Sequence, residues 1–280
     1  RTFRVPYPLF QDLVEIARSA AFWQNQGQVD CSGRPAYPVE LYVAASLRHL
    51  GKGHDFTDTI SMLCGISGSR LLQFHHNFMK FLSSAEVYHR YVNLPDDEDA
   101  SEMERLMRIY TRLGLPGCIG SVDGTHIPWE RCPISCRSWF VGKSGFPTIA
   151  FNVAVSHTGK IMHVAGPHGG TRNDKSIAKL DLFLTDLHDR KKYASIAWNR
   201  KDLRGRTYAE KGAYIICDGG YHRWRCLQCP VKWMLIKING HLNELLINVG
   251  ISGNHGGISM WSMQSIKRRI VGLCTLGLVK

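Results

Sequence analysis

The stretch YIICDGGYHRW (214–224) decides the expected fold, because it runs from an apolar segment into a carboxylate and then into a pair of glycines. A second stretch, IGSVDGTHIPW (119–129), has the same layout. Each is typical of a buried strand that ends in a turn. The strand ends carry Asp218 in the first stretch and Asp123 in the second. If these strands pair in one sheet, the two carboxylates become neighbours.

The chain beyond residue 116 combines short apolar runs with one helical run. The runs alternate in the order β-β-β-α-β, which predicts an α/β fold with a mixed sheet and helices on its faces. A basic, polar segment before the last strand is predicted to be a loop or insertion. The predicted strands are 117–123, 148–155, 161–166 and 213–217, the helical run is 173–189, and the loop is 190–211.

The N-terminal region, from residue 37 to 82, has helical periodicity and the outline of a helix-turn-helix. A turn is expected at 51–55, Thr57 can cap a short helix, 65–68 forms a second turn and Ser69 opens a second helix. Two interpretations stay open: a DNA-contacting helix, or a helical bundle with a polar face. The polar groups of the second helix are Arg70, Gln73, His75, His76, Asn77 and Lys80.

The acidic, proline-containing stretch VNLPDDEDASEME (92–104) is typical of a linker or of the start of a bridging helix. We therefore predict an all-α N-terminal domain over 1–92, a linker or bridging helix over 93–116, and an α/β domain over 117–280. Since the chain starts at Arg1 and ends at Lys280 directly after an apolar run, we expect it to be a fragment of a longer product.

The charge balance favours a polyanionic partner, of which nucleic acid is the commonest. The chain has 35 Lys and Arg against 23 Asp and Glu, a net charge of +12. Its nine cysteines are scattered, which indicates reduced thiols and disfavours a disulfide scaffold. No apolar run reaches the length of about 18 residues that a membrane helix needs, so we expect no membrane partner.

Two carboxylates from distant parts of a chain suit two-metal phosphodiester chemistry, in which hard Mg²⁺ or Mn²⁺ ions bind oxygen ligands. Glycines beside Asp123 and Asp218 would let a substrate backbone approach closely. The other interpretation makes both aspartates turn formers, since Asp-Gly is a strong turn signal. Spacing alone does not choose between them.

Three dispersed motifs, SVDGTHIPW (121–129), GPHGGTRNDKSI (166–177) and CDGGYHRWRCLQCP (217–230), resemble in this order the transposase domain of the PIF/Harbinger superfamily. The resemblance implies a ribonuclease H-like domain that cuts and joins DNA with an Asp-Asp-Glu site and Mg²⁺ or Mn²⁺. Asp123 matches the first acid and Asp218 the second. A nuclear location and a Myb-like partner protein that recognises the DNA sequence are also implied.

The third acid of that family is a glutamate on a late helix, and this chain departs from the pattern there. The basic residues Lys267, Arg268 and Arg269 are present and are expected to contact DNA, but Gly272 or Leu273 stands in place of the glutamate. We therefore predict an impaired or inactive enzyme. The alternatives are a frameshifted or mis-predicted C-terminus, replacement by Glu244, or a non-catalytic DNA-binding or partner-binding protein.

Several other residues have both a functional and a structural interpretation. His126 and Arg172 could hold a phosphate or be structural, and for Asn173 and Asp174 a helix-capping role is preferred. The thiols of Cys132, Cys136, Cys226 and Cys229 could form a zinc site, although free thiols are expected. Tyr221 and Trp224 could stack on an unpaired base, with packing at the sheet edge the preferred role.

Overall fold

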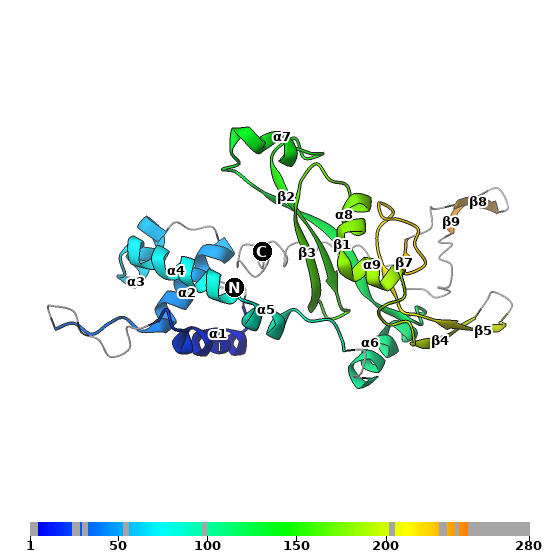
Figure 1. Cartoon of the computed structure of the whole chain (residues 1–280), viewed down its shortest axis with the longest axis horizontal. Coiled ribbons are helices and arrows are strands. Elements are labelled where there is room, and N and C mark those ends of the chain that lie inside the picture. Colours follow the sequence, from blue (N-terminus) through cyan, green and yellow to red (C-terminus); the bar gives the residue numbers. More distant parts are fainter. Residues whose placement is uncertain are drawn as a thin grey trace. The chain divides into compact units, whose positions relative to one another are not determined.

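The protein is described by a computed structural model that covers residues 5–23, 29, 33–52, 56–96, 100–201 and 205–229, and the backbone of 234–238 and 241–245. The chain divides into two compact units between Arg90 and Tyr91 (Figure 1). Within these ranges, no helix has the length and apolar character needed to cross a bilayer.

The first unit is helical. Its third and fourth α-helices are joined at Gly65, which has the left-handed φ of 71° that favours glycine. The turn expected at 65–68 is therefore present, although the following helix begins at Gly68 and not at Ser69, and the side chain of Thr57 lies outside the described residues. The elements are α1 Tyr7–Ser19, α2 Val39–Lys52, the π-helix η1 Phe56–Ile60, α3 Ser61–Cys64, α4 Gly68–Leu82 and α5 Ala85–Tyr91.

His75 belongs to the core of this unit, so the prediction that it faces outward from α4 is wrong. Its side chain is 8% exposed, and its ring lies 5.1 Å from that of His49 and 5.2 Å from that of Phe56. The reason is that α4 buries adjacent positions, Phe74 and His75, on the same wide apolar face. Of the polar groups predicted on this helix, Arg70, Gln73, His76 and Lys80 are exposed.

We expect the stability of the first unit to fall in mild acid because of His75. Burial, together with the charges of His49 and His76, lowers the pKa of His75 to about 4. Since the unfolded chain has the ordinary histidine pKa, it binds a proton that the folded state does not bind between about pH 6.5 and pH 4. Stability should therefore fall by about 2 kcal/mol through this window and level off below it.

His75→Phe should remove this part of the pH dependence, and His89→Gln, which changes an exposed histidine of α5, should retain it. The measurement is the free energy of unfolding by urea denaturation at several pH values. Equal pH dependence in His75→Phe and the wild type would contradict the assignment.

The second unit contains a five-stranded mixed sheet in the order β3-β2-β1-β6-β7. The first three strands form an antiparallel meander, and β6 and β7 continue the sheet parallel to β1. The predicted mixed α/β sheet is confirmed. The strands are β1 Cys118–Pro128, β2 Thr148–Val155, β3 Ile161–Gly169, β6 Tyr214–Ile216 and β7 Leu227–Gln228.

Helices of this unit pack on the sheet through a core that includes Ile119, Val122 and Ile215 of the strands. The segment predicted as a linker contains α6 Ala100–Arg112, which contributes Met103 to this core. The predicted helical run 173–189 is two helices, α8 Asp174–Leu180 and α9 Leu182–His188. The break lies at Asp181, whose side chain accepts the first backbone N–H groups of α9.

The segment predicted as a loop before the last strand is a hairpin, β4 Ala197–Lys201 with β5 Thr207–Lys211. Its base is fixed by Trp198, whose Nε1 donates to the carbonyl of Gly212 over 2.9 Å. Basic and polar residues that are exposed on both faces carry no clear strand periodicity, which is why the sequence did not predict it. A second hairpin pairs β8 Met234–Ile238 with β9 His241–Leu245.

Candidate active site

The parallel pairing of β1 with β6 brings Asp123 and Asp218 together. Ser121 pairs with Ile216, and each aspartate follows two residues later on its own chain segment. Asp123 is 9% exposed within β1, whereas Asp218 is half-buried directly after β6. The expectation that the two segments lie side by side is confirmed. Asp218 also forms a turn, because its Oδ1 accepts the N–H of Gly220 over 2.9 Å.

A third carboxylate, that of Asp174, approaches the same place from the start of α8. A Cβ atom added to Gly124 would lie 2.5 Å from its Oδ1. A Cβ added to Gly220 would lie 2.8 Å from its Oδ2 and 3.0 Å from Asp218 Oδ1. Asp174 therefore occupies the space that two glycines leave beside the aspartates of the strands.

Sequence analysis grouped Asp174 with Asn173 as a helix-capping residue, and the structure separates their roles. Asn173 is the N-cap of α8, with its Oδ1 accepting the N–H of Ser176 over 2.9 Å. Asp174 is the first helical residue and turns toward Gly124. The sequence offered one signal for this role of Asp174, namely an acid directly after the helix-capping Asn173. That signal does not by itself indicate a functional site.

Tyr221 lies among the three carboxylates. Its side chain is 2% exposed, and burial raises its pKa, as do the charges of Asp174, Asp123 and Asp218. The phenol therefore remains protonated, and its hydroxyl donates to Asn152 Oδ1 over 2.5 Å. Because the ring is buried and bonded, Tyr221 has the packing role, and its alternative of stacking on an exposed base is wrong.

A buried hydrogen-bond network continues from Tyr221 into the core. Asn152 Nδ2 donates to Asp181 Oδ2 over 2.5 Å, and both side chains are fully buried. The other oxygen of Asp181 pairs with His163 Nε2 at 2.9 Å and accepts the backbone N–H groups of Phe183 and Leu184. The network thus connects the loop that carries Asp218 to β2, β3 and α9.

We expect Asp181→Ala to destabilise the second unit by about 3 kcal/mol or more, because it leaves buried donors of Asn152 and α9 without their acceptor. Asn173→Ala is the matched control, since it removes an exposed helix cap with one bond and should cost about 1 kcal/mol. Both values come from urea denaturation. Equal losses in the two variants would show that Asp181 acts only as a helix cap.

The carboxylates fit a divalent cation by donor chemistry, since Mg²⁺ and Mn²⁺ prefer oxygen ligands. Their spacing is more open than that of a formed site. Among the described residues, no group of three or more His, Cys, Asp and Glu side chains is close enough to hold a metal ion. A bound cation would therefore have to draw the three carboxylates together.

His126 and Arg172 take different positions near the carboxylates. His126 Nδ1 lies 3.0 Å from the hydroxyl of buried Thr148, an arrangement that favours the structural interpretation. Arg172 is exposed on the turn before α8. The pKa of His168 is lowered mainly by the burial of its own ring and also by the charge of Arg172. The glutamate position at Gly272 or Leu273, the side chain of Glu244, and Lys267, Arg268 and Arg269 lie outside the described residues.

The cysteines do not assemble the four-thiolate zinc site. Cys229 Sγ lies 3.3 Å from Cys217 Sγ, while Cys226 is buried at the core. Trp224 has the packing role that sequence analysis preferred, because its ring stacks at 4.4 Å on His188 and at 5.1 Å on His222.

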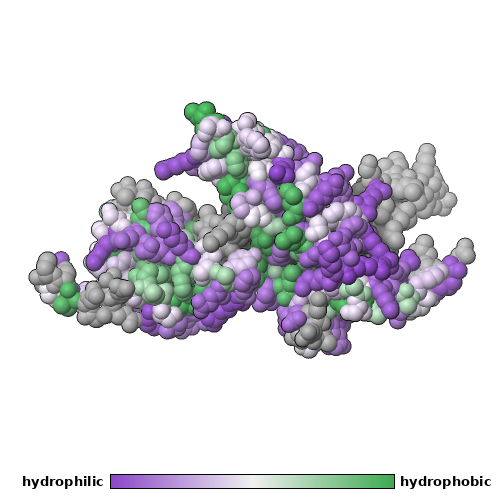
Figure 2. Space-filling model, in the orientation of Figure 1, coloured by the Kyte–Doolittle hydropathy of each residue, from purple (hydrophilic) through white to green (hydrophobic). Residues whose placement is uncertain are grey.

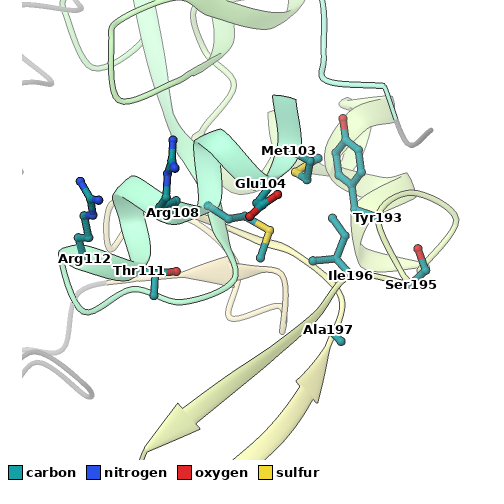
Figure 3. Close-up of a pocket in the computed structure, with 10 residues that line it drawn as sticks. Met103, Glu104, Arg108, Thr111, Arg112, Tyr193, Ser195, Ile196 and Ala197 are labelled. Atoms are coloured by element: carbon teal, nitrogen blue, oxygen red, sulfur yellow. The ribbon is translucent and has the colours of Figure 1, made fainter. Parts of the chain in front are cut away.

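A pocket of about 570 Å³ lies between α6 and the segment leading into β4 (Figure 3). Met103 and Ile196 give it apolar walls, and Arg108 and Arg112 extend from α6 at one side. None of the ten residues drawn there is one of the three aspartates, so the pocket and the acidic site are separate.

Comparisons with known proteins point to one family. A sequence model of the family described as "Plant transposon protein" matches residues 89–236, more than half of the chain. Protein ALP1-like from Arabidopsis thaliana is 25% identical over 221 residues, which cover 78% of this chain and 51% of that protein. The chain thus spans about half the length of that relative. No solved structure matches it significantly.

Proposed function

The chain belongs to the plant transposon protein family, and we propose that its second unit is a transposase-derived, metal-dependent DNA endonuclease and strand-transfer domain of the PIF/Harbinger type. The family suggests a nuclease ancestry of the Asp-Asp-Glu kind. A ribonuclease H-like fold is supported by the sheet order, in which an antiparallel meander is continued by two parallel strands. The single observation that carries the proposal is the meeting of Asp123 and Asp218 on neighbouring parallel segments.

Asp123, Asp218 and Asp174 are the residues that would hold Mg²⁺ or Mn²⁺. When bound, such ions activate the attacking oxygen and neutralise charge on the leaving oxygen of a phosphodiester. Asp174 supplies the third carboxylate from the start of α8, in place of the glutamate that the C-terminal pattern lacks. Gly219, with open space around it, leaves room for a DNA backbone beside Asp218.

The buried network fixes the loop that follows Asp218. Tyr221 holds the loop after Asp218 to Asn152, and Asp181 holds Asn152 in turn. Because Tyr221 keeps its proton, it faces the three carboxylates as a neutral group and adds no negative charge to them. The negative charge beside Tyr221 is therefore that of the three aspartates, which favours a cation there.

The expected partner of both units is DNA, and the expected location is the nucleus. The net charge of +12 supports a polyanionic partner. In the first unit, a helix-turn-helix-like role is supported by the exposed Arg70, Gln73, His76 and Lys80 of α4. Arg172, Lys267, Arg268 and Arg269 would contact phosphates, and a Myb-like partner protein would supply recognition of the DNA sequence.

A second candidate function is a non-catalytic DNA-binding or partner-binding protein that keeps the transposase fold. Two observations favour it: Gly272 or Leu273 at the position of the family's glutamate, and the open spacing of the carboxylates among the described residues. Metal binding separates the two candidates.

Asp218→Asn and Asp174→Asn should each weaken Mn²⁺ binding at least about tenfold, because each removes one anionic ligand. The measurement is titration calorimetry on the full chain, with nicking of a supercoiled plasmid beside it. Asp186→Asn, which changes a surface acid of α9, is the control and should bind Mn²⁺ like the wild type.

Three results are informative. If the wild type binds Mn²⁺ and nicks the plasmid, and both aspartate variants lose these properties, the three-carboxylate site is supported. Loss in Asp218→Asn alone excludes Asp174 and leaves the third ligand to another residue. If the wild type binds DNA but neither binds Mn²⁺ nor nicks the plasmid, the endonuclease proposal fails and the non-catalytic function is supported.

Gly220→Ala and Gly219→Ala form a matched pair at the same site. The new methyl group at Gly220 would press on the carboxylates of Asp174 and Asp218, whereas nothing lies within 4 Å of the one at Gly219. We expect Gly220→Ala to lower Mn²⁺ affinity about tenfold and Gly219→Ala to leave it within about twofold. Equal affinities in the two variants would show that Asp174 and Asp218 do not bind the metal together.

A further inference from the structure

Residues 131–147, most of the connection between β1 and β2, form a cap on these two strands. The cap carries only positive charge, although the exposed Glu130 directly precedes it. From Arg131 to Asn173 the chain has no Asp or Glu. Arg131, Arg137 and Lys143 of the cap are all exposed, as is Arg172 on the turn before α8. A surface of this kind attracts a polyanion and repels other basic surfaces.

The cap also exposes apolar side chains among these cations. Ile134 is 89% exposed, Trp139 70% and Phe146 47%. Figure 2 shows hydrophobic atoms together with hydrophilic ones at the end of the structure that Figure 1 labels α7. Basic residues interleaved with exposed aromatic rings are typical of surfaces that hold a nucleic-acid strand and stack on its bases.

Trp139 is presented on a fixed backbone. It lies in the short helix α7 Arg137–Phe140, and the adjacent ring of Phe140 packs edge-on against Trp129 at 4.7 Å. The hydroxyl of Thr171 donates to the carbonyl of Trp139 over 2.9 Å. Since these contacts hold the helix and leave the indole exposed, a base can stack on it without first ordering the loop.

The cap is joined to the acidic site through the turn before α8, which contains Gly170 and Thr171. A Cβ added to Gly170 would lie 2.5 Å from the carbonyl oxygen of Phe140, so only glycine lets the two backbones pack this closely. The turn leads within four residues to Asp174, and the cap itself begins eight residues after Asp123 on β1. The cap is therefore connected directly to the two chain segments that carry Asp123 and Asp174.

We propose that residues 131–147 form a DNA-contacting surface next to the acidic site, where Arg131, Arg137, Lys143 and Arg172 bind backbone phosphates and Trp139 stacks on an unpaired base. The proposal rests on the proposed function, because it takes DNA as the substrate. It specifies which DNA the surface prefers, namely a duplex with an unpaired base. The bases of an intact duplex offer no free ring face to Trp139.

The test is fluorescence anisotropy of labelled DNA with the full chain in EDTA, so that binding does not depend on metal. Two duplexes of one sequence are compared, one intact and one with a single unpaired base. Trp139→Ala should weaken binding of the second about tenfold and of the intact duplex less than twofold. Arg137→Gln and Lys143→Gln should weaken both, and each should lower the slope of log K against log salt by about 1.

Tyr208→Ala is the matched control, because Tyr208 is an exposed ring of the β5 strand with Arg200 and Arg206 beside it. It should bind both duplexes like the wild type. The proposal is overturned if Trp139→Ala and Tyr208→Ala behave alike, or if neither charge variant changes the salt slope. Cap variants with unchanged binding of both duplexes would also overturn it.

Failure of this proposal is distinguishable from failure of the proposed function. A wild type that binds Mn²⁺ and nicks DNA while all cap variants bind both duplexes normally would overturn the cap alone. A wild type that binds neither duplex would overturn both.

Discussion

The parallel pairing of β1 with β6 is the constraint on which the rest of the second unit depends. It brings together two aspartates that are 95 residues apart in the chain, one in a strand and one in the turn after a strand. A parallel pair needs a long crossover connection. Here that connection contains β2, β3, α8, α9 and the β4–β5 hairpin, and it delivers Asp174 to the same place.

The burial of Asp181 is the second determinant of the site. A buried carboxylate is tolerated only where hydrogen bonds satisfy its oxygens, and Asp181 has donors from β2, β3 and the start of α9. These donors fix the direction in which Asn152 presents its carbonyl oxygen to Tyr221. A buried residue outside the acidic site thus determines where the loop after Asp218 lies, and its effect on any activity would be positional.

The sequence predicted the mixed sheet and the neighbouring aspartates because apolar runs that end in Asp-Gly are local signals. It did not predict Asp174 as a neighbour, since the direction of its carboxylate depends on glycines in two other segments, Gly124 and Gly220. His75 was wrongly placed because two adjacent residues of α4 share the buried face, which polarity alone does not reveal. The ribonuclease H-like and helix-turn-helix assignments and the DNA contacts stay predictions.

The two ends of the β4–β5 hairpin lie next to each other, where the hairpin joins the rest of the second unit. Ala197 pairs with Lys211, and the N–H of Gly212 donates to the carbonyl of Ile196 over 2.8 Å, so its two ends are adjacent. Beyond Trp198, its described residues are exposed on both faces, and none of them belongs to the core of the sheet. Evolution can lengthen or shorten it without moving β6, and a reporter domain inserted near Gly205 would tag the protein while leaving the three aspartates in place.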